Sequence, residues 1–218
     1  MLQTQRFLLL FVALLWAPIS IAAPGYTQGL LWKIERTGQA PSYVFGTIHS
    51  EDSRVLTLPK PVQTVFDRSN RFVMEVVLEA NAIQAMVGAM MFSDGRTFQQ
   101  TVSTATYQKT VAAMASYGMP EQALQMMKPW ALAVTLSMPK PKTGMVLDLV
   151  LLQQATEQGK QTAGLESIEE QVGILDQLTP REQTIMLEDA LKLLPQMEQL
   201  FAEMHAVYLA RDLARMVK

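Results

Sequence analysis

The feature of this sequence that most constrains the fold is a strand–helix–strand pattern over residues 43–77. Tyr43, Val44 and Phe45 have the aromatic and β-branched side chains that favour an extended strand, and residues 71–77 (RFVMEVV) have the same character. Between them, residues 59–69 begin with proline and carry apolar side chains at helical spacing. Strands joined by a crossover helix usually pair in parallel with a right-handed connection. We therefore expect the carboxyl ends of both strands at one edge of a sheet.

The rest of the chain adds one hairpin and many helices to this unit. Residues 30–36 predict a strand that forms a hairpin with residues 43–48, and residues 159–166 predict a helix C-cap glycine followed by a short strand. Residues 79–156 have a helical pattern, and the pattern is helical again from residue 167 to the end, with a kink at Pro195. The sequence thus predicts an α/β (α+β-like) fold: a small mixed sheet with a parallel βαβ unit, a large helical insertion and a helical C-terminus.

Residues 1–22 have the features of a secretory signal peptide. Arg6 precedes an apolar run over residues 7–16, and small residues occur near Ala22. The alternative is a membrane anchor, but a bilayer span needs about 20 apolar residues and Pro18 follows this run directly. We expect cleavage, no stable membrane anchor afterwards, and a single domain over residues 23–218. The expected location is the periplasm of a Gram-negative bacterium or the extracellular medium.

Charge and composition exclude some classes of partner and site. The 218 residues carry a net charge of −2, so broad attraction to nucleic acid is not expected. The chain has no cysteine, so it has no disulfides, and any metal site must use His, Asp and Glu. The 15 methionines are scattered at helical spacings, which favours core filling over a copper site.

His49 is the best single candidate for a metal ligand or an acid/base, because it follows the first predicted strand closely and the chain has only two histidines. The alternative is that it caps the strand end or is packed in the core. Glu75 interrupts the apolar run of the next strand, so we expect a mainly buried carboxylate that faces a cavity or is paired. With parallel pairing, His49 and Glu75 lie near one sheet edge.

Two other ionisable residues are less distinctive. Asp148 lies among leucines and valines in a predicted helix, where an acid is unusual but is often simply exposed. His205 lies in the C-terminal helix, and a lone helical histidine is usually solvated or packed rather than functional.

Several segments together resemble the TraB/GumN family. They are YVFGTIHS at residues 43–50, FVMEV at residues 72–76 and GLESIEEQ at residues 164–171, with Asp148 in the helix before the last one and a signal peptide at the start. Within the family, the chain is most similar to exported bacterial GumN-like proteins. The resemblance extends over about residues 29–218, and the helical stretch 79–143 contributes least to it.

The resemblance implies an α/β fold with repeated GxxH motifs and, from the related animal Tiki proteins, a metal-dependent peptidase activity. Gly46 and His49 match the first GxxH motif, and Glu75 matches the acidic residue after the next strand. The resemblance implies that His49 and Glu75 are catalytic and hold a divalent ion (Mn, Co or Zn), with Glu166 as a further ligand or supporting group. The expected substrate is a peptide or protein.

The chain departs from the family pattern after Gln171, because no second GxxH motif follows. We therefore expect a C-terminally truncated domain that lacks one histidine ligand, binds metal weakly and exposes a strand edge that promotes self-association. Two functions remain open at this point. One is a metal-dependent hydrolase, and the other is a non-catalytic exported protein, or inactive truncated family member, that binds a peptide or partner.

Overall fold

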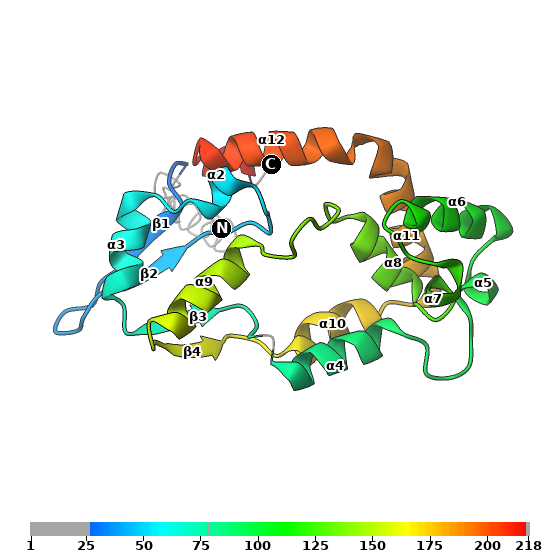
Figure 1. Ribbon diagram of the computed structural model, residues 1–218, viewed down its shortest axis with the longest axis horizontal. Coiled ribbons are helices and arrows are strands. Elements are labelled where there is room, and N and C mark those ends of the chain that lie inside the picture. The colour runs from blue at the N-terminus through cyan, green and yellow to red at the C-terminus, as the bar shows by residue number, and fades with distance from the viewer. Residues whose placement is uncertain (1–26, 78, 217–218) are drawn as a thin grey trace, which may run out of the picture.

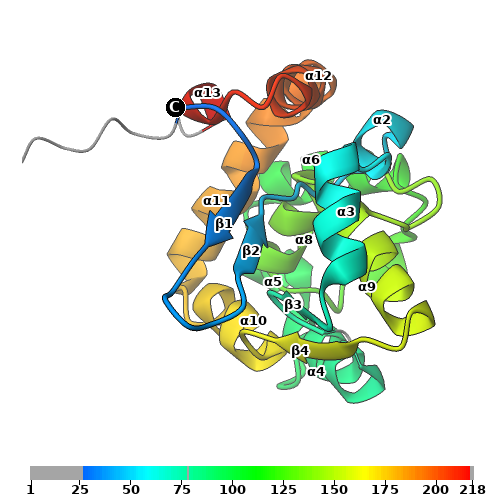
Figure 2. The ribbon, with the colours of Figure 1, turned by 90° about the vertical axis from the view of Figure 1, so that its left-hand side faces the viewer.

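Two small sheets contain all the strands that the structure describes. The structure is a computed structural model and describes residues 27–77 and 79–216, so the predicted signal peptide at residues 1–22 lies outside the described residues. Strands β1 (Leu31–Ile34) and β2 (Ser42–Phe45) form an antiparallel hairpin. Strands β3 (Arg71–Met74) and β4 (Gln161–Gly164) pair in parallel. Figure 2 shows the two pairs as separate sheets.

The predicted fold class is confirmed, but one strand pairing was wrong. The chain has a mixed α/β fold that is mostly helical, with the predicted hairpin, a parallel strand pair, a large helical insertion and a helical C-terminal part. However, β3 pairs with β4 rather than with β2, so the strands form two sheets rather than one mixed sheet. Backbone hydrogen bonding does not depend on side-chain identity, so a strand's partner is chosen by packing. Here α9 (Leu147–Glu157) packs against both β3 and β4.

The segments between β2 and β4 are almost entirely helical. Two helices lie between β2 and β3: α2 (Ser53–Leu56) and α3 (Lys60–Arg68). The insertion between β3 and α9 contains α4 (Ala80–Met90), α5 (Phe98–Thr101), α6 (Thr104–Ala115), α7 (Glu121–Leu124) and α8 (Pro129–Leu136). Figure 1 shows the sheets with α3 and α9 at one end of the molecule and α5–α8 at the other.

Capping boxes precede two of the helices that follow β4. The helices after β4 are α10 (Ile168–Asp176), α11 (Pro180–Leu193), the 3₁₀ turn η2 (Leu194–Gln196), α12 (Met197–Leu209) and α13 (Leu213–Met216). Ser167 and Glu170 form a capping box before α10, and Thr179 and Glu182 form another before α11, as the sequence predicts. Pro195 lies in η2, which separates α11 from α12 and confirms the predicted kink.

The end of α12 is a break that the helical pattern does not predict. The N–H of Arg211 donates to the carbonyl of Tyr208 at 2.9 Å, and the N–H of Asp212 donates to that of Val207 at 3.2 Å. This pair of bonds is the Schellman motif, which needs a left-handed residue just after the helix and usually has glycine there. Arg211 occupies that position with φ of 56°, and it is the single non-glycine residue with positive φ in the described part of the chain.

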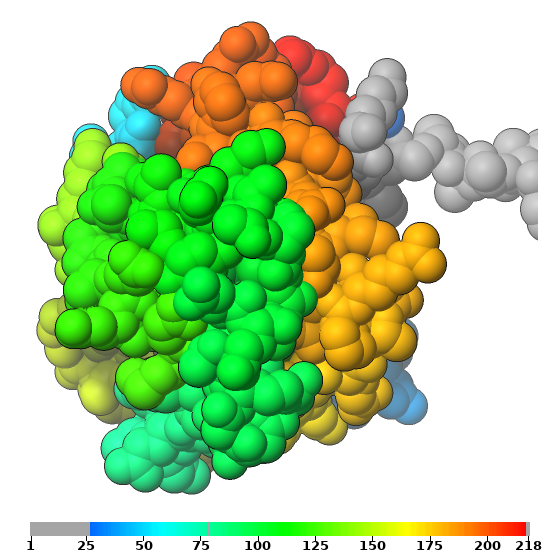
Figure 3. Space-filling model, turned by 90° about the vertical axis from the view of Figure 1, so that its right-hand side faces the viewer, coloured from blue at the N-terminus to red at the C-terminus, as the bar shows by residue number. Residues whose placement is uncertain are grey.

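The buried side chains form two cores. The larger one lies between α6, α8 and α11, and α8 contributes Trp130, Ala131, Leu132, Ala133 and Leu136 to it. Figure 3 shows this helical end of the molecule, with α11 beside the insertion. The smaller core joins the hairpin, α2, α9 and α12; its fully or nearly fully buried residues are Leu30, Val55, Leu147, Leu151 and Tyr208. The helices within the described ranges all lack the continuous apolar length that a bilayer crossing requires.

Candidate functional site

The loop that follows β2, residues 46–52, carries the predicted histidine. The N–H of Gly46 donates to the carbonyl of Leu30 at 2.8 Å, and the hydroxyl of Tyr208 on α12 donates to the carbonyl of Gly46 at 3.0 Å. Burial, followed by the charge of Asp148, raises the pKa of Tyr208 to about 12, so its hydroxyl remains a donor. The start of the loop is therefore fixed against the hairpin and the C-terminal helix.

His49 faces Asp148, which lies in the first turn of α9. Nδ1 of His49 is 3.1 Å from Oδ2 of Asp148, and the hydroxyl of Thr47 donates to Oδ1 of Asp148 at 2.6 Å. The side chain of His49 is 58% exposed, whereas that of Asp148 is 18% exposed. Oδ2 of Asp148 is a buried oxygen that accepts no hydrogen bond within the described ranges, so its contact with Nδ1 of His49 is an ion-pair contact. The pair therefore combines an accessible imidazole with a mostly buried carboxylate.

The pair shifts the pKa of both groups toward their charged forms. The pKa of His49 is raised from its ordinary value, mainly by its side-chain interaction with Asp148. The negative charges of Asp148 and Glu75 raise this pKa further, and together these effects outweigh burial, which lowers it. Burial alone would raise the pKa of Asp148, but His49 and Thr47 outweigh it and lower the pKa.

Glu75 and Glu166 lie together at the carboxyl edge of the β3–β4 pair. The carbonyl of Glu75 accepts from the N–H of Leu165 at 3.0 Å and from the N–H of Glu166 at 2.9 Å. Both glutamates are exposed, so the prediction that Glu75 is mainly buried was wrong. The reason is that β3 ends at Met74, which places Glu75 in the turn where the chain reaches the surface. Within residues 27–77 and 79–216, no three His, Asp or Glu side chains are placed to hold one metal ion.

The second histidine, His205, holds the same loop from α12. Its Nε2 lies 2.8 Å from the hydroxyl oxygen of Ser50, which is only 2% exposed. Its Nδ1 lies 3.9 Å from Oδ2 of Asp52, whose carboxylate also receives a bidentate pair of hydrogen bonds from Arg54. Those bonds from Arg54 hold the pKa of Asp52 well below its ordinary value. His205 is thus a packed residue that anchors the loop, one of the two alternatives that its helical position predicts.

Glu51 ties the loop to the segment that precedes α9. Its carboxylate accepts hydrogen bonds from the backbone N–H groups of Lys142, Thr143 and Gly144 at 2.7–3.1 Å. These bonds lower the pKa of Glu51, and the bond from Thr143 has the largest effect. Sequence reasoning did not identify Thr47, Ser50 or Glu51. Their partners lie 91 to 155 positions away, and no local pattern signals such contacts.

Replacing Asp148 with asparagine is expected to lower the pKa of His49, because the amide keeps the shape but removes the charge that favours the imidazolium. The measurement is a proton NMR titration of the imidazole signals, of which the chain has two sets; the His205→Gln variant assigns them. Asp189→Asn is the matched control, since that carboxylate pairs with Lys192 at the surface. An unchanged pKa in Asp148→Asn would show that the pair does not form.

The same shifts set the pH range in which the pair stabilises the fold. Because folding raises the pKa of His49, its contribution is full below the ordinary value of 6.5 and is lost as the pH rises through the folded-state pKa. Because folding lowers the pKa of Asp148, its contribution is full above 3.8 and is lost as the pH falls through the folded-state pKa. Both contributions are therefore full between these two pH values.

Comparison with known proteins gives one match. The sequence profile of the TraB/PrgY/gumN family matches residues 30–218, which contain both sheets and every helix described above. No curated protein and no solved structure has significant similarity to the chain.

Proposed function

The chain belongs to the TraB/PrgY/gumN family, and from this premise we propose that it is a metal-dependent hydrolase of peptide bonds that uses His49. The observation that carries the proposal is the pairing of an exposed imidazole with a mostly buried carboxylate, at 3.1 Å between Nδ1 of His49 and Oδ2 of Asp148. Hydrolytic sites commonly use a histidine whose second ring nitrogen is oriented by such a carboxylate.

Asp148 determines which nitrogen of His49 is available. With Nδ1 turned toward the carboxylate, the neutral ring carries its proton on Nδ1 and leaves the lone pair on Nε2. Thr47 holds the carboxylate in place from its other oxygen. Through this lone pair Nε2 can bind a divalent ion, and the negative charge of Asp148 makes the imidazole a stronger ligand.

The proposed ligands of a divalent ion (Mn, Co or Zn) are Nε2 of His49 and the carboxylates of Glu75 and Glu166. Imidazole and carboxylate are suitable donors for these ions, and the exposure of all three residues leaves them accessible. Such an ion, when bound, acidifies water and polarises a carbonyl group. The described side chains do not form a ready three-ligand group, so we expect weak binding that requires small movements of the two glutamates.

The proposed substrate follows from the family resemblance, the proposed location from the predicted signal peptide, and the proposed lack of a nucleic-acid partner from the net charge of −2. These proposals are a peptide or protein substrate, export to the periplasm or beyond, and no nucleic-acid partner. Self-association is also proposed, and the exposed apolar residues Ile34 and Val44 of the hairpin, at 54% and 50%, support it.

Peptide hydrolysis by the purified chain should depend on added metal. After dialysis against a chelator, the protein is expected to cleave a mixture of quenched fluorescent peptides only when Mn²⁺, Co²⁺ or Zn²⁺ is returned. Cleavage that persists in the chelator would show that hydrolysis does not depend on a metal ion, and only the proposed role of His49 would remain. A chain that binds these peptides in the chelator and cleaves none of them with any metal would instead be a binding protein.

A further inference from the structure

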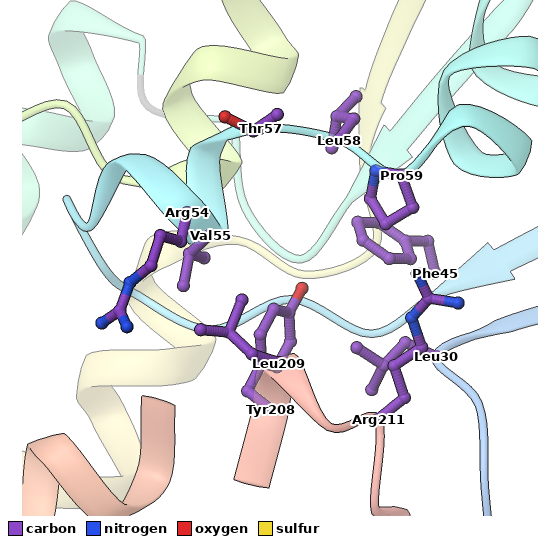
Figure 4. A pocket seen from close by; sticks show the side chains of 10 residues that line it. All are labelled: Leu30, Phe45, Arg54, Val55, Thr57, Leu58, Pro59, Tyr208, Leu209 and Arg211. Atoms are coloured by element: carbon purple, nitrogen blue, oxygen red, sulfur yellow. The ribbon is translucent and has the colours of Figure 1, made fainter. Parts of the chain in front are cut away.

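A pocket of about 260 Å³ lies between the hairpin, α2 and the end of α12, apart from the ionisable groups of the His49 site (Figure 4). Its walls are largely apolar, with Leu30, Phe45, Val55 and Leu58 among them. Tyr208 also lines it and bonds the carbonyl of the residue after Phe45, so the pocket adjoins the start of the His49 loop. The volume is just below the range of pockets for drug-sized ligands, which suits a smaller molecule.

Two arginines, Arg54 and Arg211, also line this pocket, and they differ in their partners. The charge of Arg54 is neutralised by Asp52. Nη2 of Arg54 donates to Oδ2 of Asp52 at 2.6 Å, and Nε donates to Oδ1 at 3.0 Å. Arg211 has no carboxylate within ion-pair distance among the described residues, although it lies on the same pocket. In Figure 4 its guanidinium rises on the side of Phe45, opposite Arg54. The pocket therefore combines a largely apolar lining with one exposed guanidinium that has no ion-pair partner among the described residues.

The backbone at Arg211 gives an independent reason to assign a role to its side chain. The residue occupies the left-handed position of the Schellman motif at φ of 56°, where glycine is normally favoured and a Cβ is unfavourable. The carbonyl of Arg211 accepts from the N–H of Gly29 at 2.9 Å, which fixes this conformation against the start of the hairpin. An unfavourable conformation held by surrounding contacts is typical of residues with a functional role.

We propose that this pocket binds a small carboxylate with an apolar body, of about the size of an acylated aliphatic amino acid. The guanidinium of Arg211 binds the carboxylate, because its planar pair of N–H donors matches the two oxygens. The apolar body occupies the space between Leu30, Phe45 and Val55. This binding does not require hydrolysis or metal, so it is independent of the function proposed for His49.

The test is a titration of the full chain with N-acetyl-L-leucine in the presence of a chelator, in which binding is measured by calorimetry or NMR. The neutral N-acetyl-L-leucinamide has nearly the same shape without the charge. Arg211→Asn removes the guanidinium and still tolerates a positive φ, and Arg215→Asn on α13 is the matched control. We expect the amide and the Arg211→Asn variant each to weaken binding by about tenfold to a hundredfold, and Arg215→Asn to leave it unchanged.

Other variants and ligands distinguish binding in this pocket from binding at the His49 site and from other ligand classes. His49→Ala should bind the acid as the unchanged chain does, and a loss there would move the ligand to the His49 site and overturn the proposal. Equal binding of acid and amide, equal binding by Arg211→Asn, or no binding at all would also overturn it. Tighter binding of palmitate or of inorganic phosphate would overturn the ligand class. Thermal unfolding of Arg211→Asn and Arg215→Asn verifies that both variants are folded, and Arg211→Lys should retain part of the affinity if charge matters.

Discussion

Replacing His49 with alanine is expected to reduce metal-supported peptide hydrolysis by at least about tenfold to a hundredfold, because a ligand of the ion is lost, without loss of the fold. The fold should persist because the side chain of His49 is 58% exposed and contacts Asp148 at the edge of the loop rather than in a core. The measurement is the initial rate of peptide cleavage at saturating metal, with circular dichroism to verify folding. Gln199→Ala, an exposed change on α12, is the control and should retain full activity.

The pH dependence distinguishes a catalytic imidazole from one that only supports the loop. The rate should rise as the pH passes through the raised pKa of His49, since only the neutral ring has a free lone pair on Nε2. In Asp148→Asn the same rise should occur at lower pH and with a lower maximum, because the imidazolium loses its stabilising charge. If His49→Ala cleaves peptides as fast as the unchanged chain, the hydrolase proposal fails for this site.

Replacing Leu132 with alanine is expected to lower the free energy of unfolding by about 2–5 kcal/mol. Leu132 lies on α8 with no exposed surface, in the core where α8 packs against α11, so truncation leaves a cavity that the surrounding helices fill only in part. Leu187 of α11 belongs to the same fully buried cluster. Denaturant titration of the purified chain measures the change.

Leu193→Ala is the matched control for this core prediction. The substitution is the same, but Leu193 lies at the end of α11 with 46% of its surface exposed, so less apolar contact is lost. We expect a cost below about 1 kcal/mol there. Similar costs for the two variants would mean that the α8–α11 contact is not the main core of the protein.

Local signals were sufficient to predict the helix starts and the hairpin. Ser167 with Glu170 and Thr179 with Glu182 are capping boxes whose bonds form within one turn, so the sequence contains both partners of each bond. The hairpin connects neighbouring strands through a short turn, which also requires little long-range information. Features of this kind are predictable because their energy comes from residues that are close in sequence.

The features that were not predicted depend on distant partners. The pairing of β3 with β4 joins residues 90 positions apart, such as Phe72 and Thr162, and packing by α9 rather than strand composition selects it. The exposure of Glu75 follows from where β3 ends, which is the least certain part of a strand prediction. The position of His49 just after a strand follows from the local sequence, whereas its contact with Asp148 could not be derived from spacing.

The glycine of the GTIH segment has no conformational explanation. Gly46 does not have a positive φ, and a Cβ there would make ordinary contacts of 3.8–4.0 Å with Leu30 and Trp32. A tight turn or a close backbone approach, the usual reasons for a glycine, is therefore not required at this position.

The contacts of the loop at residues 46–52 have a consequence for the timing of maturation. Its partners in the segment before α9, on α9 and on α12 lie 91 to 162 positions further along the chain, so none of them exists while only the first strands have been synthesised. Polypeptides emerge N-terminal end first, and contacts this distant in sequence form late. The nascent protein therefore lacks an ordered loop at residues 46–52 until its last long helix has docked, which delays formation of the His49–Asp148 pair until folding is nearly complete.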